Sequence, residues 1–424
     1  MGLMQKSFFI DSEQLEIESD LQLQRPLSEN GRSLGVVSTP QGVVSFMVEL
    51  AGVEDGSSCR ILEPACGDAP FLAEFHKRYG SEFEFVGVDI HNENLSVARE
   101  RLPRGEFILK DYLGWQSDQP YDIIIGNPPY GIIGDETHYP IHILRNRKSA
   151  YKKNSETWHG KYNIYGAFIE HSVKLLKPGG KLVFVIPASW LVLDDFHKLR
   201  LFLARSGMLS IYYLGKAFPG RSVFVVVLVL DKGKHGLQLF DGTELKLSKE
   251  RYDGAIIRFE DEKTRDFENS GVPLEECFRI YFAARSPEIR KNRSVVEAQL
   301  PGCVPILTGR NLHRGCIDYD RCYSGYWMPH ERAAELRAFY GFPHLVVAHT
   351  KGTAVVCAVD ERCYPWREEF HLVAKTPVSS LTGIMEYLNS DDIQNHVKQL
   401  YREFVPHLTS VMLRRIPIPR GLLK

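Results

Sequence analysis

The chain has 424 residues, of which 44% are hydrophobic and 25% are charged, and its formal net charge is −1. This length is enough to bury a full core and predicts a globular protein of two or three domains. The longest apolar run, residues 223–230, is too short to cross a bilayer, and the polar N-terminus lacks the apolar stretch of a signal peptide. We therefore expect a cytoplasmic protein with no membrane partner, in which any nucleic acid is bound by a local patch.

The eight cysteines are not spaced as metal ligands usually are. Five residues separate Cys316 from Cys322 and Cys357 from Cys363, and no C-x-x-C pair occurs. Zinc sites commonly place about two to four residues between paired cysteines. We therefore expect reduced structural thiols and no metal.

The predicted elements begin after a polar arm at residues 1–32, where Glu, Gln, Asp and Ser alternate without periodicity. A helix is expected to begin at Thr39-Pro40, with Thr39 as its cap and Pro40 as its first residue. Further helices are expected around residues 71–75, at 92–101 and at 165–176. The apolar runs predict strands at residues 60–62, 83–89, 106–109, 121–126, 181–187, 210–214 and 223–230. This alternation predicts an α/β fold with a doubly wound, mainly parallel sheet.

The alternation of strands and helices ends near residue 231. Residues 232–266 are rich in Gly, Lys, Asp and Glu and are expected to form a linker or domain boundary. The remaining chain mixes short strand-like pieces with Pro, Gly and aromatic residues. We therefore predict a flexible arm at 1–32, an α/β domain at 33–258 and a mixed α+β domain at 259–424.

The loop Asn127-Pro128-Pro129-Tyr130 directly follows the strand expected at 121–126. An enzyme that alkylates the exocyclic amine of adenine needs acceptors for its protons, because the lone pair of that nitrogen is delocalised into the ring. The side-chain oxygen of Asn127 and the carbonyl of Pro128 are candidate acceptors, and two successive prolines stiffen the loop. Tyr130 offers a flat face to an extruded base. The alternative interpretation is a surface turn, since Asn and Pro both favour turns.

Acidic residues lie at the ends of three successive strands: Glu63, Asp89 and Asp111. Open α/β sheets bind their ligands at this edge. The glycine pattern of a dinucleotide site is missing, so a ligand without phosphates fits better. S-adenosylmethionine would offer its ribose hydroxyls to Asp89 and its adenine amine to Asp111. The alternative interpretation is that these acids only cap the helices that follow.

The family resemblance rests on motifs in the following chain order: Thr39-Pro40, Glu63-Pro64-Ala65-Cys66, Asp89, Asp111 and Asn127-Pro128-Pro129-Tyr130. In this order they resemble the motifs of the γ group of adenine-N6 DNA methyltransferases. The resemblance is strongest to the Taq-type members, which belong to type II restriction-modification systems and read TCGA. The resemblance covers residues 33–417 and places the less regular domain last. Two features depart from the family pattern: the glycine-rich turn is reduced to residues 65–69, and Asp89 stands where many relatives have Glu. Further matching segments are residues 161–168, 217–219, 282–287, 307–312, 344–353 and 404–409.

The resemblance implies a Rossmann-like catalytic domain at 33–258 and a target-recognition domain at 259–424. It implies that Asn127 and Pro128 hold the target amine, that Tyr130 and Phe218 contact the flipped base, and that Pro406 fills the hole left in the duplex. It also implies that Tyr112 and Phe168 flank the adenine of S-adenosylmethionine. The other implied cofactor-binding residues are Thr39, Glu63, Pro64, Ala65, Cys66, Asp89, Ile90, Asp111 and Pro129.

Two groups of residues are candidates for contact with DNA. The segment 139–162 follows the reactive loop and would neutralise phosphates near the flipped nucleotide; the alternative is a solvated basic loop. Its basic residues are Arg145, Arg147, Lys148, Lys152, Lys153 and Lys161. In the second domain, the candidates for contact with base edges or phosphates are Arg285, Arg310, Thr350, Lys351 and Arg367.

The resemblance predicts a monomeric enzyme that acts on double-stranded DNA and protects it from a cognate restriction endonuclease. No obligatory protein partner is expected, and the location is the bacterial or archaeal cytoplasm, in association with the nucleoid. Two alternatives stay open. One is an N-methyltransferase that acts on RNA or on protein glutamine, and the other is a non-catalytic DNA-binding subunit.

Overall fold

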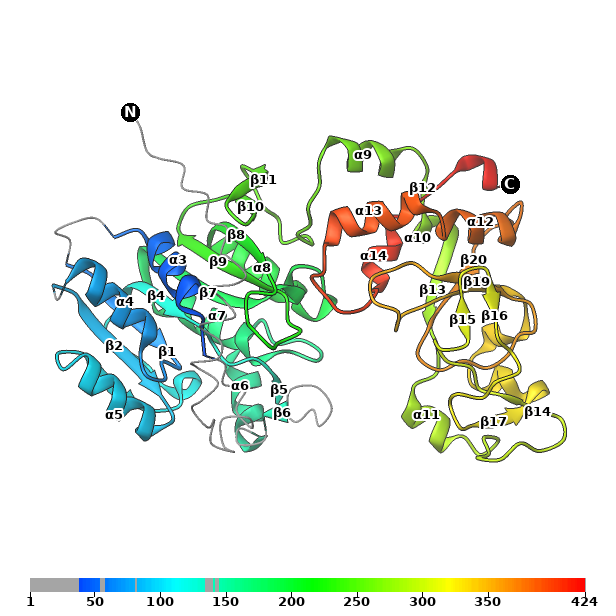
Figure 1. The fold of residues 1–424 in the computed structure, drawn as a ribbon, viewed down its shortest axis with the longest axis horizontal. Helices are drawn as coiled ribbons and strands as arrows, with labels where there is room; N and C mark the ends of the chain where they lie inside the picture. Colours follow the sequence, from blue (N-terminus) through cyan, green and yellow to red (C-terminus); the bar gives the residue numbers. More distant parts are fainter. Residues whose placement is uncertain (1–37, 54–57, 81, 134–139, 142–144, 424) are drawn as a thin grey trace. The chain divides into compact units, whose positions relative to one another are not determined.

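The computed structural model describes residues 38–423 except 54–57, 81, 134–139 and 142–144. The predicted arm at 1–32 lies outside the described residues. The chain forms two compact units, Met1–Ile257 and Arg258–Lys424 (Figure 1). Within the described residues, every helix is too short or too polar to cross a bilayer.

The first unit is built on a sheet of nine described strands in the order β11-β10-β8-β9-β7-β4-β1-β2-β3. The strands from β7 to β3 are parallel to one another, β10 is parallel to β8, and β9 and β11 are antiparallel to their neighbours. This confirms the predicted α/β fold with a mainly parallel sheet. The strands are β1 Arg60–Pro64, β2 Glu84–Asp89, β3 Glu106–Leu109, β4 Tyr121–Gly126, β7 Leu176–Pro187, β8 Gly207–Gly215, β9 Val225–Lys232, β10 Leu237–Asp241 and β11 Glu244–Lys249.

Both faces of the sheet are covered at its centre. Residues 182–186 of β7 are all 0% exposed, and a strand whose successive side chains point to opposite faces can be buried throughout only if both faces are packed. The helices of this unit are α3 Gln41–Ala51, α4 Pro70–Tyr79, α5 Asn92–Arg101, α6 Lys148–Asn154, α7 Ile164–Leu175 and α8 His197–Ser206. Shorter elements are β5 Ile132–Ile133, β6 Pro140–Ile141 and the 3-10 turns η1 Tyr112–Gly114, η2 Arg145–Arg147, η3 Ala188–Leu191 and η4 Asp194–Phe196.

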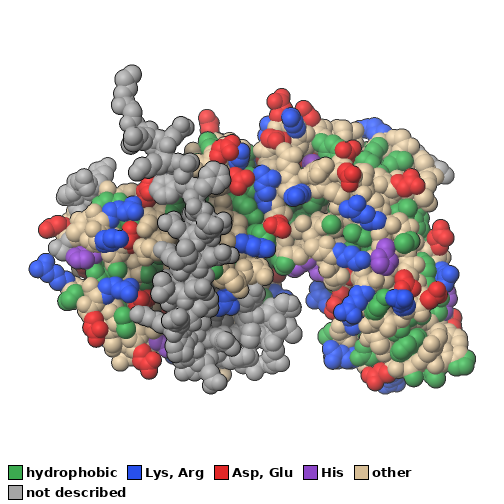
Figure 2. Space-filling model, in the orientation of Figure 1, with side chains coloured by type: hydrophobic (Ala, Val, Ile, Leu, Met, Phe, Trp, Pro, Cys, Tyr) green, Lys and Arg blue, Asp and Glu red, His purple; other side chains and the backbone are tan. Residues whose placement is uncertain are grey.

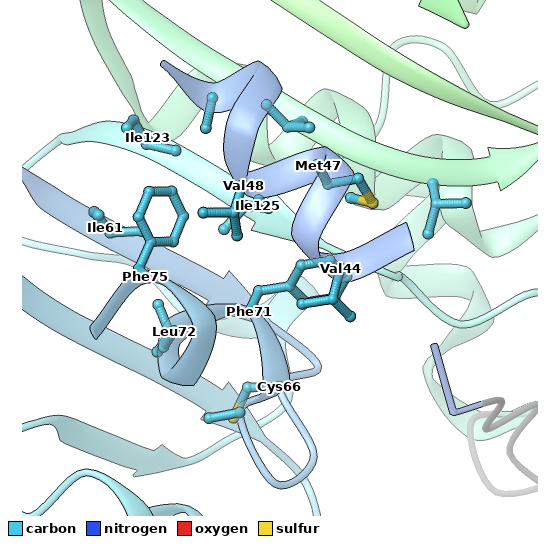
Figure 3. Close-up of a cluster of buried hydrophobic side chains, with 14 of the residues drawn as sticks. Val44, Met47, Val48, Ile61, Cys66, Phe71, Leu72, Phe75, Ile123 and Ile125 are labelled. Carbon is cyan, nitrogen blue, oxygen red and sulfur yellow. The ribbon is translucent and has the colours of Figure 1, made fainter. Parts of the chain in front are cut away.

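Helices α3 and α4 pack on the sheet through a cluster of apolar side chains (Figure 3). Val44 and Val48 of α3 and Phe75 of α4 are 0% exposed, and Ile61 of β1 and Ile125 of β4 lie in the same cluster. Full burial of each such side chain contributes about 1.5–3 kcal/mol. This packing fixes the two strands whose ends carry the predicted reactive loop and the first acidic turn.

The structure corrects three sequence-based expectations for this unit. Helix α3 begins at Gln41, because Pro40 is extended with ψ 141° and its carbonyl accepts the N–H groups of Val43 and Val44. The expected linker 232–266 contains β10 and β11, an edge hairpin whose polar outer face hides the strand pattern. Residues 177–180, which lie between the helix expected at 165–176 and the strand expected at 181–187, belong to β7.

The second unit is a mixed α+β domain, as predicted. Its antiparallel sheet has the order β13-β20-β18-β19, with β13 Phe278–Phe282, β18 His344–Val347, β19 Cys357–Asp360 and β20 Phe370–Ala374. Its helices are α9 Glu262–Asn269, α10 Leu274–Cys277, α11 Ser286–Lys291, α12 Leu381–Leu388, α13 Asp391–Tyr401 and α14 Ser410–Arg414. Shorter elements are β12 Val272–Pro273, β14 Cys303–Pro305, β15 Leu312–His313, β16 Cys316–Ile317, β17 Trp327–Pro329, β21 Pro417–Ile418, η5 His330–Glu335, η6 Ala338–Gly341 and η7 Arg420–Leu422.

A buried ion pair fastens the first segment of the second unit. The guanidinium of Arg258, 3% exposed, donates to both carboxylate oxygens of Glu268 at 2.5 and 2.6 Å. Hydrogen bonds from His396 and Arg258 hold the pKa of Glu268 well below its usual range, at about 2, against the opposing effect of burial. Phe259 continues the attachment by donating its N–H to the carbonyl of Leu400 at 2.8 Å.

Candidate active site

The carboxyl ends of four parallel strands meet at one edge of the first sheet. β1 lies between β4 and β2, and β3 follows β2, with pairs Leu62↔Ile124, Pro64↔Val88 and Asp89↔Leu109. The strand order reverses between β1 and β4, which is the position where open α/β sheets bind ligands. The structure therefore brings together the segments that follow these strands: residues 63–69, 89–91, 110–112 and 127–130.

The turn after β1 has an unusual backbone. Ala65, Gly67 and Ala69 have positive φ angles of 51°, 53° and 56°. For the two alanines this conformation costs on the order of 1–3 kcal/mol each, and such strain clusters at functional sites. A Cβ built on Gly67 would meet no atom within 4 Å. The turn therefore borders open space at Gly67.

Glu63 caps the helix that follows the turn. Its side chain is 2% exposed, and Oε2 accepts the N–H of Leu72 at 3.0 Å, in the first turn of α4. Burial raises the pKa of this carboxyl well above its usual range. Glu63 therefore caps α4, as the alternative interpretation expected. Its contact with S-adenosylmethionine stays a prediction.

Asp89 joins two of the strand-end turns. Its Oδ1 accepts the N–H of His91 at 2.8 Å, and its Oδ2 accepts the N–H of Gly67 at 2.9 Å. The side chain is 7% exposed. A carboxylate offers about four acceptor positions, so these two bonds leave capacity for hydroxyl groups. The neighbouring Ile90 is exposed.

Asp111 is held by the basic segment that follows the reactive loop. Its Oδ2 accepts from Nη1 of Arg147 at 2.6 Å and from the hydroxyl of Tyr151 at 2.7 Å, and its Oδ1 accepts the N–H of Leu113 at 3.3 Å. The hydrogen bond with Asp111 raises the pKa of Arg147. Lys148 donates to the carbonyl of Ile133 at 2.6 Å. Arg147 and Lys148, which were expected to meet phosphates, are thus engaged within the domain.

Tyr112 and Phe168 contact each other directly. Their ring centroids are 5.1 Å apart with an interplanar angle of 34°. A base held between two rings needs about 7 Å, which is twice the normal contact distance. The two rings therefore form one wall. This differs from the sequence-based expectation that they flank an adenine from opposite sides. The hydroxyl of Tyr112 is fixed 2.8 Å from that of Ser172, which sequence reasoning missed.

Asn127 begins the reactive loop beside the turn after β1. Its Nδ2 donates to Oγ1 of Thr39 at 3.1 Å. Thr39 therefore orients this amide instead of capping α3, which corrects the expected role. A Cβ on Gly126 would lie 3.4 Å from the carbonyl of Pro64, so β4 approaches the end of β1 closely. Pro128 is buried, and Pro129 is half-buried.

Tyr130 is fixed by its hydroxyl as well as by its ring. The ring is 7% exposed and packs edge to face on Tyr165, and its hydroxyl donates to the carbonyl of Val185 at 2.9 Å. The pairing of β4 with β7 ends at Gly126↔Phe184, so Tyr130 reaches the carbonyl one residue beyond that ladder. Burial raises the pKa of Tyr130 well above its usual range.

The end of the loop is anchored by Asn163, which sequence reasoning did not single out for this role. Oδ1 of Asn163 accepts the N–H of Gly131 at 2.8 Å, and the N–H of Ile164 donates to the carbonyl of Gly131 at 2.8 Å. Both backbone groups after Tyr130 are thus fixed by the start of α7. Phe218 is 2% exposed and packs in the core cluster, so it offers little surface to a flipped base.

In the second unit, the predicted DNA-binding residues lie on segments joined by backbone pairing. Ala284 forms a bridge with Arg367, and Leu307 forms one with Trp366. Arg285, Arg310, Thr350 and Pro406 are exposed, and Lys351 is half-buried and donates to the carbonyl of Leu312. Figure 2 shows acidic and basic side chains mixed over the visible face of the molecule. This mixture agrees with the expectation that nucleic acid is bound by a local patch and not by a broad field of one charge.

Comparison with known proteins identifies the family. The chain is 54% identical over 406 residues, which is 93% of this chain and 94% of the other, to the type II methyltransferase M.TthHB8I of Thermus thermophilus. The chain belongs to the type II methyltransferases. Residues 75–218 match the Eco57I restriction-modification methylase family, and residues 304–418 match the TaqI-like C-terminal specificity domain.

A more distant relative and a solved structure are also similar to parts of this chain. RM.Eco57I of Escherichia coli, a type II restriction enzyme and methyltransferase, is 29% identical over 118 residues, which is 27% of this chain and 11% of that one. The DrdV–DNA complex shares the fold with a TM-score of 0.52 and 13% identity, over 81% of this chain and 50% of that one. The chain is therefore a DNA methyltransferase of a restriction-modification system, and S-adenosylmethionine is its methyl donor, as predicted.

Proposed function

We propose that this methyltransferase modifies the N6 amine of adenine, as a member of the γ group. The observation that carries the proposal is the placement of Asn127, whose amide lies at the switch point of the sheet and is oriented by Thr39. The Asn127 side-chain oxygen and the Pro128 carbonyl accept the protons of the amine and draw its nitrogen toward tetrahedral geometry. A preorganised acceptor pair of this kind acts mainly on the transition state.

The donor is held by the turns at the strand ends. Its sulfonium centre supplies an electrophilic methyl group when bound. Asp89 accepts from the ribose hydroxyls and Asp111 from the adenine amine, and the open space beside Gly67 suits a ligand there. Tyr112 and Phe168 form one wall for the adenine. The remaining proposed donor contacts are Thr39, Glu63, Pro64, Ala65, Cys66, Ile90 and Pro129.

The target adenine is extruded from the duplex to reach Asn127. Base flipping costs a few kcal/mol, which stacking and backbone contacts must offset. Tyr130 presents the exposed part of its ring to the base, whereas Phe218 is 2% exposed and has little surface for this contact. In the second unit, Pro406 fills the gap in the duplex. Arg285, Arg310, Thr350 and Lys351 meet base edges or phosphates of 5'-TCGA-3'.

The biological setting follows from the proposed reaction. We propose a monomer, because a palindromic site lets one active site modify each strand in turn. The modified DNA resists a cognate restriction endonuclease, and the enzyme acts in the cytoplasm at the nucleoid. Membership of a DNA-modifying family speaks against the alternatives of an RNA or protein glutamine substrate. The oriented Asn127 amide supports catalysis over a non-catalytic binding role.

Nucleoside analysis after labelled-methyl transfer tests the proposed chemistry. The purified chain is incubated with methyl-labelled S-adenosylmethionine and duplex DNA, RNA or protein, and the DNA is digested to nucleosides. We expect the label in N6-methyladenine from DNA alone. Label in a methylated cytosine, or in RNA or protein instead of DNA, would contradict the proposal.

A further inference from the structure

Glu369 is a buried carboxylate at the base of the loops that carry the proposed DNA contacts. It is 0% exposed and lies immediately before β20. Its Oε2 accepts the backbone N–H of His349, and its Oε1 accepts the hydroxyl of Thr350 at 2.9 Å. A Cβ built on Gly309 would lie 2.4 Å from Oε1, so the loop that carries Arg310 passes directly against this carboxylate.

His349 extends this junction to the segment that carries Pro406. Its Nδ1 lies 2.8 Å from the carbonyl of Leu408, and it must carry a hydrogen because a carbonyl can only accept. The N–H of Leu408 donates to the carbonyl of Gly352 at 2.7 Å. Both backbone groups of Leu408 are therefore fixed by the loop that Glu369 holds, two residues after Pro406.

The backbone of Glu369 also holds the segment that carries Arg285. Its carbonyl accepts the N–H of Ala283 at 2.8 Å, and the N–H of Glu368 donates to the carbonyl of Ala284 at 3.2 Å. Three segments with proposed DNA contacts thus meet at Glu369, and a fourth joins them through His349. They are residues 283–285, 307–312, 349–352 and 405–409.

An ionisable group that is buried is an expensive way to hold loops together. Burial raises the pKa of Glu369 to about 7, and buried charges contribute little net stability compared with apolar packing. Their best-attested benefit is to specify one arrangement among several. At this junction, the arrangement that the carboxylate specifies is the position of Thr350 and of the loop against Gly309.

We propose that Glu369 is a positioning residue for target recognition, which sets the loops bearing Arg310, Thr350 and Pro406 in the arrangement that discriminates the target from altered sites. The inference rests on the proposed DNA contacts of these loops. Glu369 acts through its neighbours and does not itself touch the bases. Its loss therefore affects discrimination between DNA sites more than donor binding or the chemical step.

Glu369→Gln tests this role, since it keeps the shape but replaces one acceptor oxygen by an amide donor. Glu268→Gln is the matched control, because it is the same change at a carboxylate whose partners are Arg258 and His396. For each variant we would measure kcat and KM on the mapped target duplex and on duplexes with one altered base pair. Donor affinity and the midpoint of thermal unfolding are measured in parallel.

We expect Glu369→Gln to raise the KM for target DNA and to lower the discrimination ratio about tenfold, with kcat at saturation and donor affinity within twofold of the parent. Glu268→Gln should lower thermal stability and keep the ratio. A folded Glu369→Gln protein with an unchanged ratio would overturn the inference, as would an equal loss in Glu268→Gln.

Two further arms keep the test decisive. If Glu369→Gln does not fold, Gly309→Ala places a methyl group against the same carboxylate, and a ratio equal to that of the parent would overturn the inference. The parent enzyme separates the inference from the proposed function. If the site mapped for the parent enzyme is not an adenine of TCGA, the proposed function fails, and the discrimination ratio is measured at the mapped site instead. If no methyl transfer occurs, equilibrium binding of the target and altered duplexes gives the discrimination ratio.

Discussion

The Nδ2 of Asn127 lies 3.1 Å from Oγ1 of Thr39 and donates a hydrogen bond to it. This contact joins the first residue after β4 to the residue that precedes Pro40 at the start of α3. It identifies the nitrogen as the end of the amide that faces Thr39. In the proposed reaction, this orientation is what makes the amide an acceptor for the target amine.

Replacement of Asn127 by Ala is expected to reduce single-turnover methyl transfer by about two to three orders of magnitude, the usual cost of removing one preorganised dipole from an active site. Donor and DNA affinity should change little, because the side chain contacts neither ligand extensively. Rapid-quench measurement of the transfer rate decides, with both affinities as controls. A rate within tenfold of the parent would exclude the proposed role.

Thr39→Val removes the hydroxyl that orients Asn127 and keeps the shape of the side chain. One hydrogen bond contributes about 0.5–1.5 kcal/mol, so we expect the transfer rate to fall roughly two- to tenfold. Thr39→Ser should restore it, since it returns the hydroxyl. Equal rates for the Val and Ser variants would show that Thr39 does not act through Asn127.

Asp89→Ala is expected to weaken donor binding by roughly 1.5–3 kcal/mol, the usual contribution of a hydrogen bond to a charged acceptor. DNA affinity should stay close to that of the parent. Because Asp89 also accepts the N–H of Gly67, thermal unfolding must be followed as a control for the turn itself. Calorimetric titration with S-adenosylmethionine measures the affinity. An unchanged affinity would show that Asp89 has only a structural role in the strand-end turns.

Tyr130→Phe is expected to retain most of the activity and to lose stability. The aromatic face stays for the base, but the carbonyl of Val185 loses its partner, which costs about 1–3 kcal/mol. Tyr130→Ala should also lose base capture, by about 1–3 kcal/mol. A fluorescent adenine analogue at the target position reports extrusion. If the Phe and Ala variants fail equally, the hydroxyl matters for catalysis and the stacking account is wrong.

The buried pair His344 and His371 should make the second unit sensitive to acid. Nδ1 of His344 must donate to the carbonyl of Phe342 at 2.7 Å, so its Nε2 accepts from Nδ1 of His371, also at 2.7 Å. Burial lowers the pKa of both rings, and that of His371 is lowered well below its usual range. Both histidines are therefore neutral in the folded protein.

The sign of the pH effect follows from linkage. Below about pH 6.5 the unfolded chain binds protons at these histidines and the folded chain does not, so stability is present above that pH and is lost as pH falls. Thermal unfolding between pH 8 and pH 5 measures the effect. The double variant His344→Phe, His371→Leu should show a flatter dependence than the parent, and an identical slope would exclude this origin.

Sequence patterns predict the buried half of the first unit closely, because its strands and helices have strong periodicity. The expected ranges of α5, β3 and β4 agree with the observed Asn92–Arg101, Glu106–Leu109 and Tyr121–Gly126. The edge hairpin of β10 and β11 was missed. Of the six residues of β11, only Leu247 is buried, so the pattern reads as a polar linker.

The composition of the candidate site was easier to predict than its contacts. The strand-end acids and the loop at Asn127 follow from chain order and parallel topology. The bond from Thr39 to Asn127 spans 88 positions, and that from Arg147 to Asp111 spans 36. Contacts at such separations depend on packing that no local pattern encodes. The burial of Phe218 in the core is another feature that only the tertiary structure reveals.

Mapping of the modified base tests the central claim most directly. The chain and its Asn127→Ala variant are expressed in a host that lacks this modification, and the host DNA is challenged with an endonuclease that cuts unmethylated TCGA and then sequenced for modified bases. The account predicts that the parent gives resistant DNA with N6-methyladenine at TCGA on both strands, while the variant gives DNA that is cut. Fully cut DNA despite folded, donor-binding parent protein, or a methyl group on cytosine, would contradict it.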